Sequence, residues 1–173
     1  MKNYTACFTG HRIIPLFERA TVSKILENAV IESIENGYRY FGAGGALGFD
    51  TMAALTVLRL RNKYPQIKLI LVLPCENQTR NWKAVDIEKY EHIKSQADKV
   101  VKTSIEYTPG CMHKRNRHLV DNSSLCICYL KKPSGGTVYT VNYAKDNRLK
   151  VIIFLIQRLN NRMIIGFHTF WVK

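Results

Sequence analysis

Residues 42–50 read Gly-Ala-Gly-Gly-Ala-Leu-Gly-Phe-Asp, the most glycine-rich stretch of the chain. A short apolar run at 38–42 leads into it, and a segment with helical periodicity follows at 48–63. Strand, glycine turn and helix in this order are typical of the βα units that build a parallel sheet. The stretch therefore predicts one βα unit of an α/β protein.

The same alternation continues along the chain on both sides of this unit. We expect strands at 4–9, 38–42, 68–73, 99–102, 125–130 and 150–156, and helices at 17–36, 48–63, 82–96, 112–122 and 137–147. The pattern predicts a Rossmann-like three-layer α/β sandwich with a mostly parallel central sheet.

The length of 173 residues suits one domain. We assign residues 1–156 to a single domain and residues 157–173 to a C-terminal tail. The tail is basic, apolar and aromatic, without a clean period. This composition fits an extra strand, an oligomer contact or a segment outside the main fold.

Three turns place glycine or small residues between the end of a strand and the start of a helix. They are residues 9–12 (Thr-Gly-His-Arg), residues 42–50 and residues 134–137 (Ser-Gly-Gly-Thr). The carboxyl ends of parallel strands lie at one edge of a sheet, so we expect these turns to converge. Free N–H groups at helix N-termini attract phosphate. A single glycine turn fits a purely structural role equally well, but three at one edge favour a phosphate site.

Polar side chains from two further segments are expected at the same edge. Glu76 and Gln78 follow the strand at 68–73, where they suit contacts to a base or ribose and equally well a solvated loop. Arg115 and Asn116 lie near the start of the helix at 112–122, and a guanidinium pairs well with phosphate. The predicted ligand-binding residues are Gly10, His11, Arg12, Gly44, Gly45, Gly48, Asp50, Glu76, Gln78, Arg115, Asn116, Gly135, Gly136 and Thr137.

The order and spacing of these motifs, together with Pro74, Trp82 and the pair Val120-Asp121, resemble the YpsA-like family of the SLOG superfamily. That superfamily also includes the DprA (Smf) and LOG lineages, and the resemblance extends to about residue 155. It implies a Rossmann-like fold that binds or senses a nucleotide or nucleotide-derived ligand. Whether the protein catalyses a reaction is left open, and no catalytic residue is assigned.

The LOG lineage implies an alternative function, hydrolysis of the N-glycosidic bond of a nucleoside monophosphate. Its Met-His-x-Arg segment matches residues 112–115. Its Pro-Gly-Gly-x-Gly-Thr turn is only partly matched by residues 133–137, and the glutamate three residues further on is Thr140 here. Glycosidic cleavage normally needs carboxylates, so the hydrolase hypothesis requires Asp50, Glu76 or Asp121 in its place.

A second alternative is single-stranded nucleic-acid binding of DprA type. Residues 101–173 carry 12 Lys and Arg against 3 Asp and Glu, whereas residues 1–100 carry 14 against 10. Basic residues beside aromatic side chains such as Tyr139 and Tyr143 suit single strands. The resemblance to SLOG proteins also implies a homodimer.

The remaining composition excludes several classes of protein. Cys126 and Cys128 lie two apart in an expected strand, so both thiols should be buried on one face rather than bind a metal. We predict no metal and no resident cofactor. No stretch approaches the ~18 apolar residues of a spanning helix, and none has the form of a signal peptide. We therefore expect a cytoplasmic protein with no membrane partner.

Overall fold

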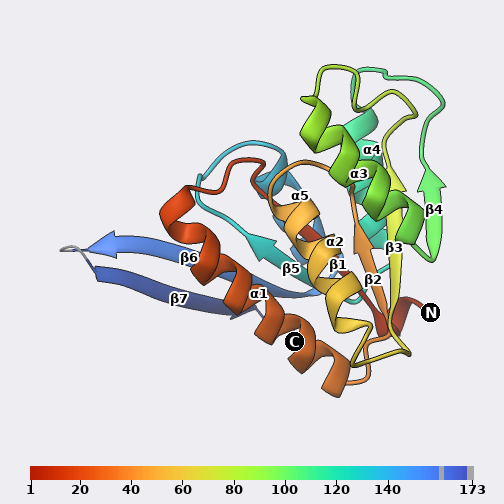
Figure 1. Cartoon of the computed structure of the whole chain (residues 1–173). Coiled ribbons are helices and arrows are strands. Elements are labelled where there is room, and N and C mark those ends of the chain that lie inside the picture. Colours follow the sequence, from red (N-terminus) through yellow and green to blue (C-terminus); the bar gives the residue numbers. More distant parts are fainter. Residues whose placement is uncertain (160–161, 171–173) are drawn as a thin grey trace.

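A computed structural model describes residues 1–159 and 162–170 of the chain as one sheet covered by helices on both faces (Figure 1). Its strands are β1 Thr5–Gly10, β2 Tyr40–Ala43, β3 Lys68–Leu73, β4 Lys99–Lys102, β5 Leu125–Tyr129, β6 Lys150–Leu159 and β7 Arg162–Phe170. Its helices are α1 Leu16–Glu35, α2 Phe49–Leu60, α3 Ala84–Gln96, α4 Cys111–Asp121 and α5 Gly136–Asp146, with a short 3-10 turn, η1 Lys2–Tyr4, at the start. All expected elements are present, and β3 and β4 have the predicted bounds.

The strands follow the order β4-β3-β2-β1-β5-β6-β7, and the six strands from β4 to β6 are parallel. The expected Rossmann-like α/β class and its mostly parallel sheet are therefore confirmed. From β1 the chain adds strands outward to β4, then returns to the other side of β1 with β5. Such a reversal leaves a crevice at the carboxyl ends of the two central strands, and ligands of open α/β sheets commonly bind there.

Alternation along the strands divides the buried side chains into two cores, one on each face. Ala6 and Phe8 of β1 belong to the core under α1, α2 and α3, whereas Cys7 belongs to the core under α4 and α5. Cys126 and Cys128 lie with Cys7 in this second core. All five cysteines are buried and unpaired, as expected of thiols that pack as small apolar groups.

The segment after residue 156 continues the sheet. The strand expected to end there runs to Leu159, and β7 pairs with it antiparallel from Val151–Phe170 to Leu159–Arg162. Only two residues separate β6 from β7 in the sequence, and a connection of that length permits antiparallel pairing alone. Of the three interpretations of the tail, the structure therefore supports the extra strand, and the hairpin extends away from the helical layers (Figure 1).

Within the described part of the chain, no helix combines the length and apolarity that crossing a bilayer requires.

Candidate functional site

A pocket of about 300 Å³ opens at the carboxyl ends of β1 and β5, where the strand order reverses. Residues from the β1–α1 turn, the loop before α2 and the first turns of α4 and α5 line it. They are Phe8, Thr9, Gly10, His11, Arg12, Ala46, Asp50, Met112, Arg115, Asn116, Gly136 and Thr137. Eight of the fourteen residues predicted from the sequence therefore lie around one cavity.

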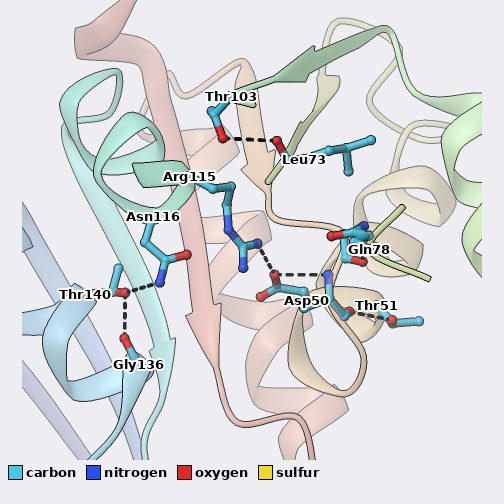
Figure 2. A network of polar contacts seen from close by, with 11 residues as sticks. Asp50, Thr51, Leu73, Gln78, Thr103, Arg115, Asn116, Gly136 and Thr140 are labelled. Carbon is cyan, nitrogen blue, oxygen red and sulfur yellow. Dashed lines mark hydrogen bonds and ion pairs between the residues drawn. The ribbon is translucent and has the colours of Figure 1, made fainter. Parts of the chain in front are cut away.

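A buried ion pair forms one wall of the pocket (Figure 2). Nη1 of Arg115 on α4 lies 3.2 Å from Oδ2 of Asp50 on α2, and both side chains are 7% exposed. The backbone N–H of Ala46 also donates to this carboxylate oxygen, at 3.4 Å. Nε of Arg115 is buried and has no hydrogen-bond partner among the described residues.

Gly44 makes room for this pair. A Cβ at that position would lie 1.2 Å from Nη1 of Arg115 and 2.6 Å from Oδ2 of Asp50. The glycine therefore lets a guanidinium, rather than a ligand, approach the backbone. Gly44 therefore does not line the pocket itself, whereas Arg115, for which it makes room, does.

Positively charged side chains outnumber negatively charged ones around the pocket. Burial lowers the pKa of Arg115, Asp50 opposes that shift, and the neighbouring Arg12 cation adds to it. Burial also raises the pKa of Asp50, an effect that Arg115 and the N–H groups of Ala46 and Gly44 partly offset. Two guanidinium groups thus face one carboxylate, and an anion in the pocket would relieve their repulsion.

The β1–α1 turn brings His11 and Arg12 to the rim. The N–H of Phe49 donates to the carbonyl of His11 at 3.2 Å, and a Cβ on Gly48 would come within 2.1 Å of the Arg12 carbonyl oxygen. Nε2 of His11 accepts the backbone N–H of Lys132 at 3.1 Å. Partial burial, followed by the charges of Lys132 and Lys131, lowers the pKa of His11. His11 is therefore neutral at pH 7.

The first turn of α5 presents free backbone donors to the pocket. Its N-cap, Gly135, has φ of +97° and offers no side chain to the N–H groups of the first turn. No atom lies within 4 Å of a Cβ built on Gly135 or Gly136, so this turn is open to a ligand. Gly136 and Thr137 line the cavity with uncapped N–H groups and the positive end of the helix dipole.

A hydrogen-bond network joins α4 to α5 behind this turn (Figure 2). Nδ2 of Asn116 donates to Oγ1 of Thr140 at 2.8 Å, and the Thr140 hydroxyl donates to the Gly136 carbonyl at 2.8 Å. Thr140 occupies the position where the LOG pattern has glutamate. Here it orients Asn116 instead of supplying a carboxylate.

The other predicted residues lie outside the pocket. Gln78 donates to the Gly45 carbonyl at 3.1 Å, beside Tyr90, so these two residues brace the loop before α2. Glu76 is exposed and pairs with Lys102. Gly44 lies beneath Arg115, Gly48 lies against Arg12, and Gly135 precedes the lining residues of α5.

Glu18, a buried carboxylate close to the site, was not among the residues predicted from the sequence. It accepts hydrogen bonds from the hydroxyl of Tyr129 and from the ammonium group of Lys131. The Tyr129 ring in turn contacts the rings of His11 and Phe49, with centroids 6.1 and 5.9 Å away. A signal was present, because Glu18 lies four residues before Val22 and so on the apolar face of its helix.

Metal ligands do not gather in the part of the chain that the structure describes. No group of three His, Cys, Asp or Glu side chains there is placed to hold an ion.

Comparison with known proteins identifies relatives across most of the chain. The YpsA family model, described as "YspA SLOG family", matches residues 7–160. The SPbeta prophage-derived protein YoqJ of Bacillus subtilis is 32% identical over 136 residues, which cover 70% of this chain and 79% of YoqJ. The UPF0398 protein YpsA of Bacillus subtilis is 28% identical over 130 residues, which cover 73% and 72% of the two chains.

Solved structures share the fold at lower identity. DNA processing protein A from Helicobacter pylori, described in a single-stranded DNA binding mode, has a TM-score of 0.65 at 19% identity, covering 92% of this chain and 68% of its own. DprA from Streptococcus pneumoniae has a TM-score of 0.67 at 18% identity, covering 92% and 53%. TM1055 has a TM-score of 0.54 at 16% identity, covering 87% and 72%.

Proposed function

Because this chain belongs to the YpsA family of SLOG proteins, and its sheet edge holds a cationic pocket, we propose that it binds the phosphate of a nucleotide or nucleotide-derived ligand there. Arg115 and Arg12 supply charge, and the first turn of α5 supplies backbone N–H donors. Asn116, held by Thr140, contacts a neighbouring hydroxyl or base. Binding or sensing, rather than turnover, is the function that these groups suit best.

The observation that carries this proposal is the uncapped N-terminus of α5, which faces the same cavity as the guanidinium groups of Arg115 and Arg12. Free N–H groups at a helix N-terminus and the positive end of the helix dipole attract a phosphate. A phosphate bound there would accept hydrogen bonds from these helix amides, and the two guanidinium groups would balance its charge.

Thermal-shift titration with AMP, ATP, ADP-ribose, NAD and cyclic dinucleotides tests the proposal. A ligand at 100 times its Kd stabilises the fold by about 2.7 kcal/mol. Arg12→Gln should weaken binding about tenfold or more without loss of stability, because Arg12 is exposed and loses one charge-assisted contact. Arg80→Gln is the matched control, since Arg80 is exposed and lies outside the pocket. Equal effects of the two variants, or no response to any ligand, would contradict the proposal.

Carboxylate positions argue against the alternative of a LOG-type hydrolase. Among the residues that line the pocket, Asp50 is the carboxylate, and it is engaged by Arg115. Glu76 pairs with Lys102, and Asp121 accepts a hydrogen bond from Tyr143 at 3.0 Å. Release of free base from nucleoside monophosphates in the same titration would reverse this conclusion.

A row of aromatic rings on α4 and α5 supports single-stranded nucleic acid as a second candidate ligand. The ring centroids of His113 and Tyr139 are 4.3 Å apart, and those of Tyr139 and Tyr143 are 6.3 Å apart with nearly parallel planes. Lys114 and Arg117 are exposed on α4 nearby. Oligonucleotide binding that falls steeply with salt and is lost in Tyr139→Ala would favour this candidate, and the DprA structures make it worth testing.

We also propose a cytoplasmic protein that forms a homodimer, and the resemblance to SLOG proteins implies the dimer. Sedimentation equilibrium tests the oligomeric state directly.

A further inference from the structure

A second, larger hollow lies on the other side of the β1–α1 turn. It has a volume of about 610 Å³ and is bounded by the start of α1, the outer face of α2 and the start of α3. Helix α2 lies between α1 and α3 on this face of the sheet (Figure 1). Its lining residues are Arg12, Ile13, Ile14, Arg19, Leu47, Gly48, Thr51, Met52, Leu55, Lys83, Asp86 and Lys89.

The hollow borders the proposed phosphate pocket. Arg12 lines both cavities. The loop before α2 and the first turn of α2 also contribute residues to both cavities. Ala46 and Asp50 line the pocket, whereas Leu47 and Thr51 line the hollow. The close approach of Gly48 to the Arg12 backbone fixes this partition.

The chemistry of the hollow combines an apolar floor with cations. Leu47, Met52 and Ile14 supply apolar surface. Arg12, Arg19, Lys83 and Lys89 face one acidic residue, Asp86. The structure gives Lys83 and Lys89 no ion pair with any described residue, so their charges are available to a ligand.

We propose that the natural ligand carries two anionic groups and spans both cavities, with one group at Arg115 and the second at Lys83 and Lys89. A planar or apolar segment between the groups passes Arg12 and covers Leu47 and Met52. The ligand class is therefore a dinucleotide-like molecule rather than a mononucleotide. This inference rests on the proposed phosphate pocket and adds a second subsite to it.

The volumes support a small two-part ligand. The pocket alone, at about 300 Å³, is at the lower limit of cavities that hold drug-sized molecules. The hollow adds about 610 Å³ directly beside it. An anionic occupant is favoured because four cations, Arg12, Arg19, Lys83 and Lys89, face a single carboxylate around the hollow.

Three probes of graded charge test the inference by isothermal titration. They are adenosine 5′-monophosphate (pA), the 5′-phosphorylated dinucleotide pApA, and the same dinucleotide with an uncharged methylphosphonate linkage. The wild-type protein should bind pApA about tenfold or more tightly than pA, because pApA gains charge-assisted contacts. The methylphosphonate analogue has the size of pApA without the second charge, so it should bind like pA.

Paired variants separate the subsite from the general charge of the protein. Lys83→Gln with Lys89→Gln should reduce pApA affinity to that of pA and leave pA affinity unchanged. Lys63→Gln with Lys99→Gln removes the same charge from exposed positions outside the hollow and should leave pApA affinity near the wild-type value. Circular dichroism melting checks that both double variants remain folded.

The outcomes distinguish the two proposals. If pA binds but pApA binds no more tightly, or if the two double variants behave alike, the second subsite is refuted and the phosphate pocket stands. If pApA binds only through Lys83 and Lys89 and pA does not bind, the proposed phosphate site in the pocket is refuted. The hollow is then supported as an anion site. If no probe binds, both are refuted, and an acidic protein segment becomes the better occupant of the hollow.

Discussion

At the scale of the residue, the glycines of this protein serve two different purposes. The Arg115 guanidinium occupies the space where a side chain at Gly44 would lie, and the Phe49 ring occupies the corresponding space at Gly10. Cγ of Phe49 would lie 2.5 Å from a Cβ built on Gly10. Gly136, by contrast, faces open space at the pocket. Glycine in a βα turn therefore marks a ligand contact only where no side chain of the protein occupies the space.

Replacing Gly44 by alanine should destabilise the fold. The added Cβ would displace the Arg115 guanidinium and break its pair with Asp50. Loss of a buried ion pair costs about 3–5 kcal/mol, which urea unfolding would detect. Gly136→Ala is the control: it should change stability by less than about 1 kcal/mol while weakening ligand binding. Similar stability of the two variants would contradict this account.

His11 should respond to both pH and ligand. Its pKa is lowered by burial and by Lys132 and Lys131, so the folded state binds a proton less readily than the unfolded state. The associated stability is therefore fully present above about pH 6.5 and is lost as pH falls from there through the folded-state pKa. An NMR titration, assigned with His11→Gln, measures this pKa directly. A bound phosphate should raise it, and a pKa of 6.5 or above without ligand would refute the prediction.

At the scale of the element, Glu18 attaches the start of α1 to the end of β5. It is 2% exposed and accepts from Tyr129 and Lys131. Burial, then the contact with Glu18, raises the pKa of Tyr129, so the hydroxyl stays a donor at all physiological pH values. The attachment holds Tyr129, whose ring packs against His11, in place from outside the pocket.

Glu18→Gln and Tyr129→Phe should therefore be energetically coupled. Each single variant removes part of one buried contact and should cost about 1–3 kcal/mol in urea unfolding. The double variant should cost less than the sum, with a coupling of about 0.5–3 kcal/mol, because both changes remove the same interaction. Strict additivity would show that the contact contributes nothing to stability. Lys131→Gln extends the cycle to the third member.

At the scale of the whole molecule, the parallel sheet and the β6–β7 hairpin contribute differently. Six parallel strands with their five helices hold both cores and the pocket. In the described sheet, strand β7 pairs with β6 and forms the edge on that side. We therefore propose that the parallel part is the ligand-binding domain, with the hairpin strand as an addition to it.

A chain that ends at residue 159 should fold with its pocket intact but self-associate. In the full chain the edge strand is β7. Loss of β7 makes β6 the edge, and the apolar run at residues 151–156 of β6 would make that edge more prone to aggregate. Size-exclusion chromatography and a thermal melt would reveal oligomers and a lower Tm, with unchanged affinity for the pocket ligand. A truncated chain that cannot fold would show that β7 belongs to the minimal domain.

Local sequence patterns determined the order and type of the elements, since apolar periodicity and glycine turns act over a few residues. They predicted β3 and β4 to the residue, and they predicted the parallel sheet. They also identified the turns that supply His11, Arg12, Gly136 and Thr137 to the pocket. The tail remained undecided because β7 forms only by pairing with β6, and its own residues lack a clean period.

Tertiary structure alone decided which predicted residues share a cavity. Arg115 and Asp50 are 65 positions apart in sequence, and only packing of α4 beside the loop before α2 brings them within 3.2 Å. The same packing gives Gly44 its role and leaves Glu76 and Gln78 outside the pocket. Spacing along a chain specifies which face of an element a side chain occupies. Long-range contacts, which depend on all the elements at once, decide what that face meets.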